Sequence, residues 1–240
     1  MIRITCANLS TYTMPTPSSL VTDGLVKKTL AEKLLAEIMN GSLAPGTRII
    51  EGRWAQHFGV AQGTIREAIN ILERHGFVTK ESGRSARVIN LTEKDVVQLY
   101  QMRSAVEGLA ANLASQAQPD FSNLQSIVDG MRRAANAKSA ANMLDWDLKF
   151  HLELCSLSRN KYLVDYAQRM LTPFFAFVRL RMITGGRGTS VWDKDLESHQ
   201  RIVDLLREGD GEMAEQYVKK AMVRFAKTAY DNWVAHEQRP

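Results

Sequence analysis

Three residues in the second half of the sequence have the types and spacing of a metal site. Asp147 and His151 stand four residues apart on a segment with helical periodicity, which places both side chains on one helix face. His199 lies near the middle of a later predicted helix. A carboxylate and two imidazoles are an ordinary ligand set for zinc, nickel, manganese or iron. A hydrogen-bonded Asp–His pair with a separate structural histidine fits the same pattern, and both interpretations stay open.

Arg103 is a further residue whose position asks for a chemical explanation. It lies on a predicted helix over residues 92–117, on a face that turns into a helical bundle, where a guanidinium needs an acceptor. The carboxylate of a bound small molecule, held by two N–H groups of the guanidinium, would be one such acceptor. Glu107, one helical turn further on, would be another, and both alternatives stay open.

The residues after about position 90 predict six helices and no convincing strand. Pro119, a glycine-rich break near residue 185 and the Gly209–Gly211 turn separate several of them. The predicted helices cover roughly 92–117, 120–138, 139–157, 160–183, 192–208 and 210–236. Six helices of this length can bury a shared core as an antiparallel bundle. Residues 91–240 are therefore predicted to form one all-helical domain.

The residues before position 90 predict three short helices followed by a hairpin. The helices are expected over about 23–40 and 51–58 and from near residue 61, and the strands over 77–80 and 86–89. A capping-box pattern from Thr64 to Glu67 also allows the third helix to start three residues later. This order of elements indicates a winged helix-turn-helix over residues 23–90, preceded by a flexible tail over residues 1–22.

The third helix of this unit carries side chains suited to reading DNA. Its exposed early positions are Gln62, Thr64 and Arg66. Glutamine pairs with adenine, threonine contacts a thymine methyl or a phosphate, and arginine reads guanine or holds phosphate. Asn70 lies one turn further along and is expected to reach the same groove. A small helical domain whose polar side chains merely face water is the alternative.

The charge distribution favours a polyanionic partner for the first third of the chain. Residues 1–90 hold 11 Lys and Arg against 7 Asp and Glu, whereas residues 91–240 hold 20 against 19. The turn of the predicted hairpin contributes Gly83 and Arg84, which suit a wing tip that contacts the minor groove or the backbone.

The composition excludes several classes of protein. With 240 residues, 45% hydrophobic and 24% charged, the chain has material for one or two globular domains and is not a disordered or fibrous protein. The densest apolar segment, residues 171–180, is too short to span a membrane and contains Pro173 and Arg179. Two cysteines cannot form a disulfide framework, and the N-terminus is a poor secretory signal, so a cytoplasmic location is expected.

The first domain resembles the GntR-type bacterial transcription regulators. Residues 40–49, with the sequence NGSLAPGTRI, are similar to the family's G-x-L-x-P-G entry. Residues 58–60, 65–69 and 72–78, with the sequences FGV, IREAI and LERHGFV, are similar to its L-G-V, V-R-E-A-L and L-x-x-x-G-L-V stretches. The resemblance implies that Arg66 contacts the DNA backbone and that Gly83 lies in the wing.

Two departures from that family concern the DNA contacts. The Ser-Arg-Thr-Pro that usually starts the recognition helix is Ala-Gln-Gly-Thr over residues 61–64, and Ala61 is a weak helix cap. An arginine common in the second helix is replaced by Gly52, with Arg53 beside it. The operator is therefore expected to differ from the commonest ones, with Arg53 as a contact.

The second domain resembles the FCD effector domain of FadR-like members. Residues 100–110, 147–151 and 198–210 look like its R-x-x-L-E, D-x-x-F-H and E-H-x-x-I…G-D motifs. In metal-binding members an Asp and three His hold a divalent ion beside a pocket for small carboxylates. Asp147, His151 and His199 correspond to three of these ligands, and the fourth falls at Ala221. A three-ligand site binds metal less tightly, so metal-bound and metal-free domains stay open.

Together these features predict a homodimeric transcription regulator, with repression as the default, on a palindromic DNA operator. A small organic acid would bind the helical domain at Arg103, Asp147, His151 and His199 and alter operator binding. One alternative is a regulator that responds to fatty acyl-CoA without a metal. A helical metal-dependent enzyme is a less favoured alternative, because the sequence places no clear general base beside the three ligands.

Overall fold

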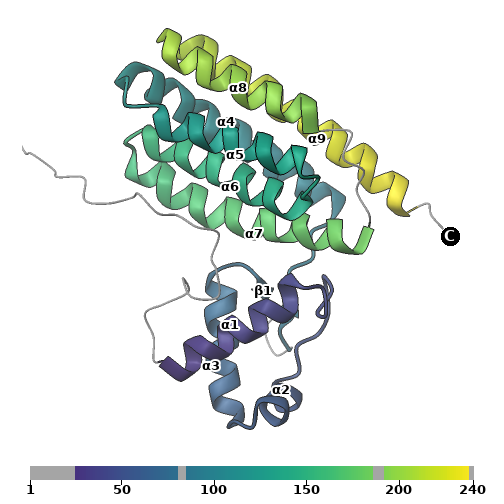
Figure 1. Cartoon of the computed structure of the whole chain (residues 1–240). Helices are drawn as coiled ribbons and strands as arrows, with labels where there is room; N and C mark the ends of the chain where they lie inside the picture. The colour runs from purple at the N-terminus through teal and green to yellow at the C-terminus, as the bar shows by residue number, and fades with distance from the viewer. Residues whose placement is uncertain (1–24, 81–84, 186–191, 238–240) are drawn as a thin grey trace, which may run out of the picture.

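The computed structural model describes residues 25–80, 85–185 and 192–237 of the chain. The segment expected to form a flexible tail and the wing residues Gly83 and Arg84 lie outside the described residues. Within them the chain forms a lower unit, called the head, and a larger helical unit above it, called the body (Figure 1). The mainly helical fold class predicted from the sequence is confirmed.

Over residues 25–80 and 85–90, the head consists of three helices and a short antiparallel hairpin: α1 (Leu25–Met39), α2 (Glu51–Phe58), α3 (Gln62–Arg74), β1 (Val78–Thr79) and β2 (Arg87–Val88). Gly59 ends α2 with φ +64, a conformation that glycine adopts without steric cost, and the turn to α3 follows directly. Ile65 and Ile69 of α3 are fully buried, as the helical spacing predicts. The start of α3 at Gln62 excludes the later start that the Thr64–Glu67 capping pattern allowed.

The hairpin is shorter than the sequence predicts, and its second strand has a second neighbour. Val78 pairs with Val88 and Thr79 with Arg87, so each strand is two residues long rather than four. The backbone of Val88 also bonds to Gly46 and Thr47, at 3.1 and 2.9 Å. The segment predicted only as a Pro-Gly turn therefore forms a third extended edge beside β2.

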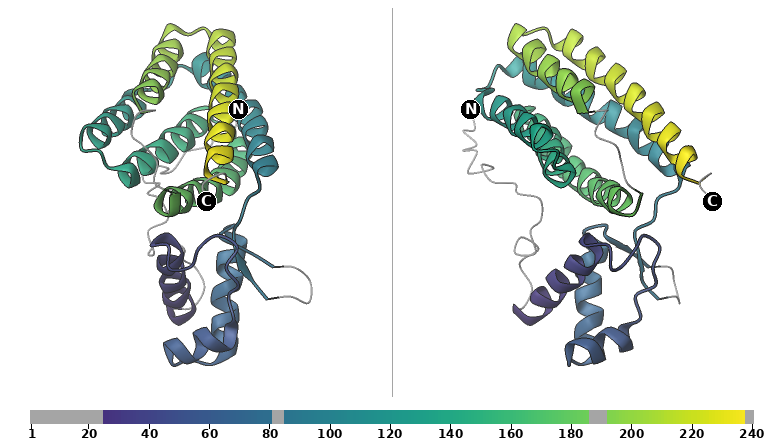
Figure 2. Two further views of the ribbon diagram at one scale, coloured as in Figure 1. Left: turned by 90° about the vertical axis from the view of Figure 1, so that its right-hand side faces the viewer. Right: turned by 45° about the vertical axis from the view of Figure 1, so that its right-hand side comes forward.

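In the part of the body that the structure describes there are six long helices: α4 (Glu93–Ala117), α5 (Ser122–Asn136), α6 (Ala140–Leu157), α7 (Lys161–Gly185), α8 (Trp192–Glu208) and α9 (Gly211–Glu237). Figure 2 shows α4 and α9 running side by side along one edge of the bundle and α5, α6 and α7 grouped on the other. A capping box between Thr92 and Asp95 starts α4.

The head and the body meet at α7, which contacts α1. Pro173 lies inside α7, in the part of the helix nearest the head. Among the helices that the structure describes, none is both long enough and apolar enough to cross a bilayer.

Candidate metal centre and nucleic-acid interface

Asp147, His151 and His199 come together inside the body. One ligand atom from each residue lies within 4.8 Å of the other two. His151 Nε2 is 3.0 Å and His199 Nε2 is 3.1 Å from the same oxygen, Asp147 Oδ1. Both imidazoles are 3% exposed. The sequence spacing predicted that Asp147 and His151 lie side by side on one helix. The packing of the helices brings His199 to the same carboxylate.

Two helices of the bundle hold these side chains in place. Asp147 and His151 lie one turn apart on α6, and His199 lies on α8. Phe150, which precedes His151, is fully buried and packs perpendicular to the His199 ring, with the ring centroids 4.5 Å apart. The consecutive residues Phe150 and His151 of α6 therefore have two roles: His151 is a candidate ligand, and the Phe150 ring orients the second candidate imidazole, His199.

The outer nitrogens of the two imidazoles contact hydrogen-bond acceptors. His199 Nδ1 donates to the backbone carbonyl oxygen of Asp195 at 2.6 Å, since a carbonyl oxygen only accepts. His151 Nδ1 lies 2.5 Å from Glu107 Oε2. A carboxylate there favours a proton on Nδ1. In their neutral forms, both imidazoles then turn an Nε2 lone pair toward Asp147 Oδ1.

This convergence is the arrangement that a cation stabilises. Two imidazole lone pairs and a carboxylate oxygen face one another at about hydrogen-bond distance, and acceptors repel unless something positive lies between them. Metal-ligating histidines characteristically turn their other N–H toward a carboxylate or a backbone carbonyl. Here His199 Nδ1 donates to the Asp195 carbonyl, and His151 Nδ1 lies beside the Glu107 carboxylate. The donor set therefore fits a divalent transition metal such as zinc or nickel.

Protonated histidine is the alternative source of positive charge. Burial lowers the pKa of His151, but the Glu107 and Asp147 carboxylates outweigh it and raise this pKa above its ordinary value. For the Glu107 carboxyl group burial has the opposite sign and raises the pKa, but Arg103 and His151 outweigh it and bring the pKa of Glu107 down to about 2. Burial opposes ionisation of Asp147 too, but its close contacts with His151 and His199 hold the pKa of Asp147 below its usual value. The carboxylates are ionised at neutral pH.

Arg103 is buried and paired with Glu107. Its Nε donates to Glu107 Oε1 at 2.7 Å, and the two residues are 3% and 0% exposed. The guanidinium carbon lies 5.1 to 5.3 Å from the ring centroids of Tyr100, Phe174 and Phe175. The ion pair that the sequence allowed is formed. Arg103 is not among the candidate metal ligands, because Glu107 lies between it and His151.

The contact between Glu107 and His151 was missed by the sequence reasoning, which considered Glu107 only as a partner for Arg103. The available signal was the placement of an acidic residue on the buried face of α4, where one ion pair does not satisfy both carboxylate oxygens. Ala221, where the resemblance expected a fourth histidine, is fully buried in α9.

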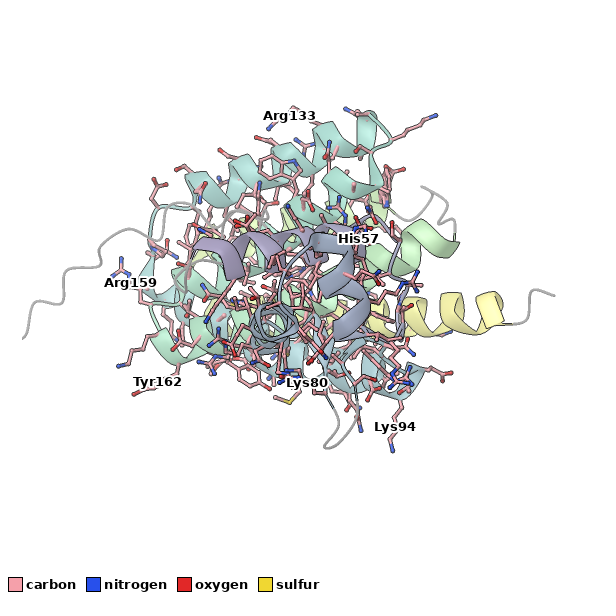
Figure 3. The ribbon with its side chains drawn as sticks, turned by 90° about the horizontal axis from the view of Figure 1, so that it is seen from below. His57, Lys80, Lys94, Arg133, Arg159 and Tyr162 are labelled. Carbon is pink, nitrogen blue, oxygen red and sulfur yellow. The ribbon has the colours of Figure 1, made fainter. Side chains whose placement is uncertain are left out.

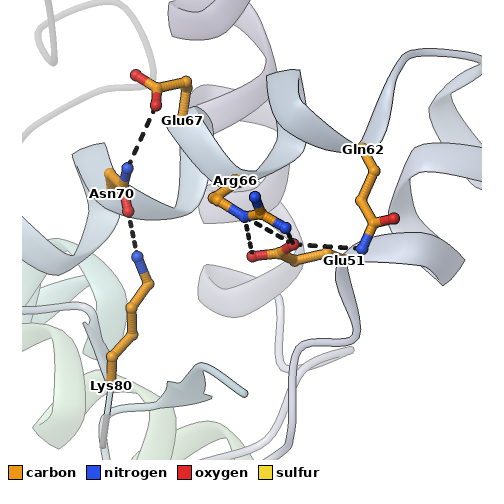
Figure 4. Close-up of polar contacts among 6 residues, drawn as sticks. All are labelled: Glu51, Gln62, Arg66, Glu67, Asn70 and Lys80. Carbon is orange, nitrogen blue, oxygen red and sulfur yellow. Dashed lines mark hydrogen bonds and ion pairs between the residues drawn. The ribbon is translucent and has the colours of Figure 1, made fainter. Parts of the chain in front are cut away.

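The recognition helix α3 presents Gln62 and Arg66 beside Glu51 of α2. Arg66 Nε lies 3.1 and 3.0 Å from the two Glu51 oxygens, and Arg66 Nη2 lies 2.8 Å from Oε2 (Figure 4). Gln62 Nε2 donates to the same Oε2 at 3.3 Å. Glu51 was not among the residues that the sequence selected, because an acidic side chain is not itself a ligand for phosphate.

The other predicted DNA contacts occupy different environments. Arg53 of α2 is exposed and Thr64 is half-buried. Asn70 accepts a hydrogen bond from Lys80 and donates to Glu67 at 3.5 Å, which turns it toward the base of the hairpin. Lys80 is basic, and the sequence analysis did not select it. The view from below places the head in front of the body, with Lys80 on this face (Figure 3).

Comparisons with known proteins find matches for both the head and the body. The model of the family described as "Bacterial regulatory proteins, gntR family" matches residues 26–88, and that of the "FCD domain" matches residues 98–224. The chain is 28% identical to the uncharacterized HTH-type transcriptional regulator YdhC of Bacillus subtilis, over 75% of this chain and 80% of that one. It is 24% identical to a gluconate operon transcriptional repressor of Bacillus licheniformis, over 77% and 76%. The crystal structure of a transcriptional regulator GntR from Rhodococcus sp. RHA1 matches 84% of this chain and 96% of that one, with a TM-score of 0.69 and 25% identity.

Proposed function

Because the chain belongs to the GntR family of bacterial regulatory proteins with an FCD domain, it is a transcription regulator and not an enzyme; we propose that its body binds a small organic acid through a divalent metal. The observation that carries this proposal is the convergence of His151 Nε2 and His199 Nε2 on one oxygen of Asp147. The relative named for the gluconate operon supports an organic acid as the effector class.

Asp147, His151 and His199 would hold the metal, which would supply a Lewis-acid centre for an effector carboxylate. Three protein ligands leave coordination positions for that carboxylate or for water. Glu107 holds the proton of His151 on Nδ1, and Arg103 holds Glu107 through Nε. Arg103 also places positive charge near the site, which favours an anionic effector over a neutral one.

The head would bind DNA through α3 and the wing. The major groove would be contacted by Gln62, Thr64 and Arg66, and the edges of that groove by Arg53 and Asn70. The wing would contact DNA through Gly83 and Arg84. One such head makes a small interface, so we propose a homodimer on a palindromic operator, in the cytoplasm where the operator is. Repression relieved by the effector is the expected mode.

Native mass spectrometry of the purified full-length protein tests this proposal. We expect a dimer that retains about one divalent ion per chain and loses it on treatment with a strong chelator. Reloading with zinc should permit a set of small mono- and dicarboxylates to raise the melting temperature, whereas the chelated protein should respond weakly. A chelated protein that binds the same acids equally well would exclude the metal from effector binding.

A regulator that responds to fatty acyl-CoA without a metal is the second candidate. The observation in its favour is Ala221, which replaces the fourth ligand expected from the resemblance. The same mass spectra distinguish the two, because an acyl-CoA adds a mass of several hundred daltons and survives the chelator.

A further inference from the structure

Glu51 is the first residue of α2 and contacts two side chains of the recognition helix at once. Its carboxylate accepts from Arg66 Nε and Nη2, at distances of 2.8 to 3.1 Å, and from Gln62 Nε2 at 3.3 Å. Arginine and glutamine are both side-chain types that hydrogen-bond with base edges. Figure 4 shows both side chains directed to the same carboxylate from one side of α3.

The pairing leaves Arg66 accessible while cancelling much of its charge. The Arg66 side chain is 58% exposed, and Glu51 beneath it is 23% exposed. A guanidinium has five N–H donors, and the carboxylate engages two of them, so others remain for DNA. The hydrogen bond from Arg66 is the main cause that lowers the pKa of Glu51, so the carboxylate is charged at neutral pH.

A negative charge at this place has opposite effects on the two kinds of DNA contact. Attraction to phosphate is electrostatic and independent of sequence, so a carboxylate beside Arg66 weakens it on every duplex. Base contacts depend on the direction of each donor, and a side chain already held in one direction loses less conformational freedom on binding. Repulsion of the wrong sequences is as effective for specificity as attraction to the right one.

We propose that Glu51 is a specificity-determining residue of the DNA interface, which weakens the general attraction of Arg66 for phosphate and orients Arg66 and Gln62 together toward one base sequence. The carboxylate itself reads no base. It raises the ratio between binding of the preferred sequence and binding of any other.

Glu51→Gln in the full-length protein tests this role, because it removes the charge and keeps the shape. The matched control is Glu67→Gln, which removes the same charge from α3. Glu67 pairs with Lys27 at 3.6 Å, and glutamine keeps a side-chain oxygen that can accept the 3.5 Å hydrogen bond from Asn70. The wild-type protein first selects a preferred duplex from a pool with a randomised 20-base-pair core. The affinity of each variant is then measured for that duplex and for a shuffled duplex of equal composition, over a series of salt concentrations.

We expect Glu51→Gln to bind the shuffled duplex about three- to tenfold more tightly, with a salt dependence steeper by about one released counterion. Its affinity for the selected duplex should rise less or fall, so its selectivity drops by at least about threefold. Glu67→Gln should change both affinities by the same factor and leave the selectivity intact.

Two results would overturn the role of Glu51. If both variants change binding alike, the effect is one of net charge only. If Glu51→Gln weakens both duplexes and lowers the urea midpoint of unfolding, the residue only braces α2 against α3. A wild-type protein that selects no sequence would instead contradict the DNA interface itself, so the two failures are distinguishable.

Discussion

Gly76 lies against Pro173, and this contact joins the end of the recognition helix to the body. A Cβ placed on Gly76 would come within 2.8 Å of Pro173 Cβ and 2.9 Å of Pro173 Cγ. The next residues of α7, Phe174 and Phe175, pack around the Arg103 guanidinium, and the Phe175 ring centroid lies 5.9 Å from that of His151. Three consecutive residues of α7 therefore connect the two units. Pro173 contacts the head, while Phe174 and Phe175 pack against residues of the candidate effector site.

Gly76→Ala should lower the free energy of unfolding by about 1–3 kcal/mol, because φ is +74 at this residue and the added methyl meets Pro173. Urea denaturation of the full-length protein measures the change. The control is Gly63→Ala inside α3, where no atom lies within 4 Å of the added Cβ. Alanine should stabilise that position by about 0.5–1 kcal/mol. Equal effects of the two substitutions would contradict the close packing at residue 76.

Pro173→Ala tests whether this contact couples the two units. It trims the side chain that contacts Gly76 and leaves the candidate metal ligands unchanged, so the protein should bind zinc as the wild type does. The change in DNA affinity that zinc or a carboxylate causes should shrink at least about threefold, because coupling requires contacts that differ between two arrangements. Gel-shift titrations with and without zinc report this change. An unaltered response would place the coupling elsewhere.

His151→Ala should abolish the stabilisation of the protein by zinc. Zinc at 100 times its dissociation constant should stabilise the wild type by about 3 kcal/mol, since a ligand that binds only the folded state adds stability. Thermal unfolding with and without zinc measures the difference, and His199→Ala provides a second variant in case one of them folds poorly.

The matched control for both variants is His57→Ala. His57 is an exposed histidine of α2, the helix at the end of the head away from the body in Figure 1. Its substitution should leave the zinc response unchanged. Zinc stabilisation that persists in both His151→Ala and His199→Ala would exclude this metal centre.

Glu107→Gln should reduce zinc affinity by about 10- to 100-fold, although Glu107 is not a proposed ligand. The amide no longer holds the proton on His151 Nδ1 as the carboxylate does at 2.5 Å, and such outer partners tune the basicity of a metal-bound imidazole. It also leaves Arg103 buried without its charged partner, which should cost about 3–5 kcal/mol of stability.

Isothermal titration calorimetry measures the affinity, and Asp129→Asn is the control. Asp129 forms an exposed ion pair with Arg132, so its loss should cost at most about 1 kcal/mol and leave zinc binding intact. A Glu107→Gln protein that binds zinc as tightly as the wild type would show that Glu107 does not act through His151.

The helices of both units were predictable because their apolar residues repeat at the spacing of one helix face. The fully buried Ile65 and Ile69 of α3 are an example. The third extended edge beside β2 was not predictable, because its backbone bonds join Thr47 to Val88 across 41 positions and no local pattern encodes them.

The candidate sites were predictable only where their residues share one helix. Asp147 and His151 lie on one turn of α6, so their spacing gives their neighbourhood. Glu107 reaches His151 from α4, and Glu51 reaches Arg66 from α2, each through packing between helices. Both are acidic residues whose roles lie in positioning a neighbour, and composition alone does not distinguish them from solvated surface.

Arg66→Ala and Gln62→Ala should weaken DNA binding in different ways, because Arg66 contributes a positive charge as well as a directed contact, whereas Gln62 contributes a directed contact alone. Loss of Arg66 removes a cation that is 58% exposed, so affinity should fall on every duplex, and the slope of log affinity against log salt should decrease by up to about 0.9. Loss of Gln62 removes a neutral base contact, so binding of the preferred duplex should fall by about 1–3 kcal/mol while the salt slope stays unchanged. Fluorescence anisotropy with preferred and shuffled duplexes separates the two, with Arg132→Ala in the body as the charge-matched control for Arg66. Because Arg66 is already paired with Glu51, its loss should change the slope of log affinity against log salt by well below the roughly 0.9 expected for one full charge. If Arg66→Ala and the Arg132→Ala control change this slope equally, α3 is not part of the DNA interface.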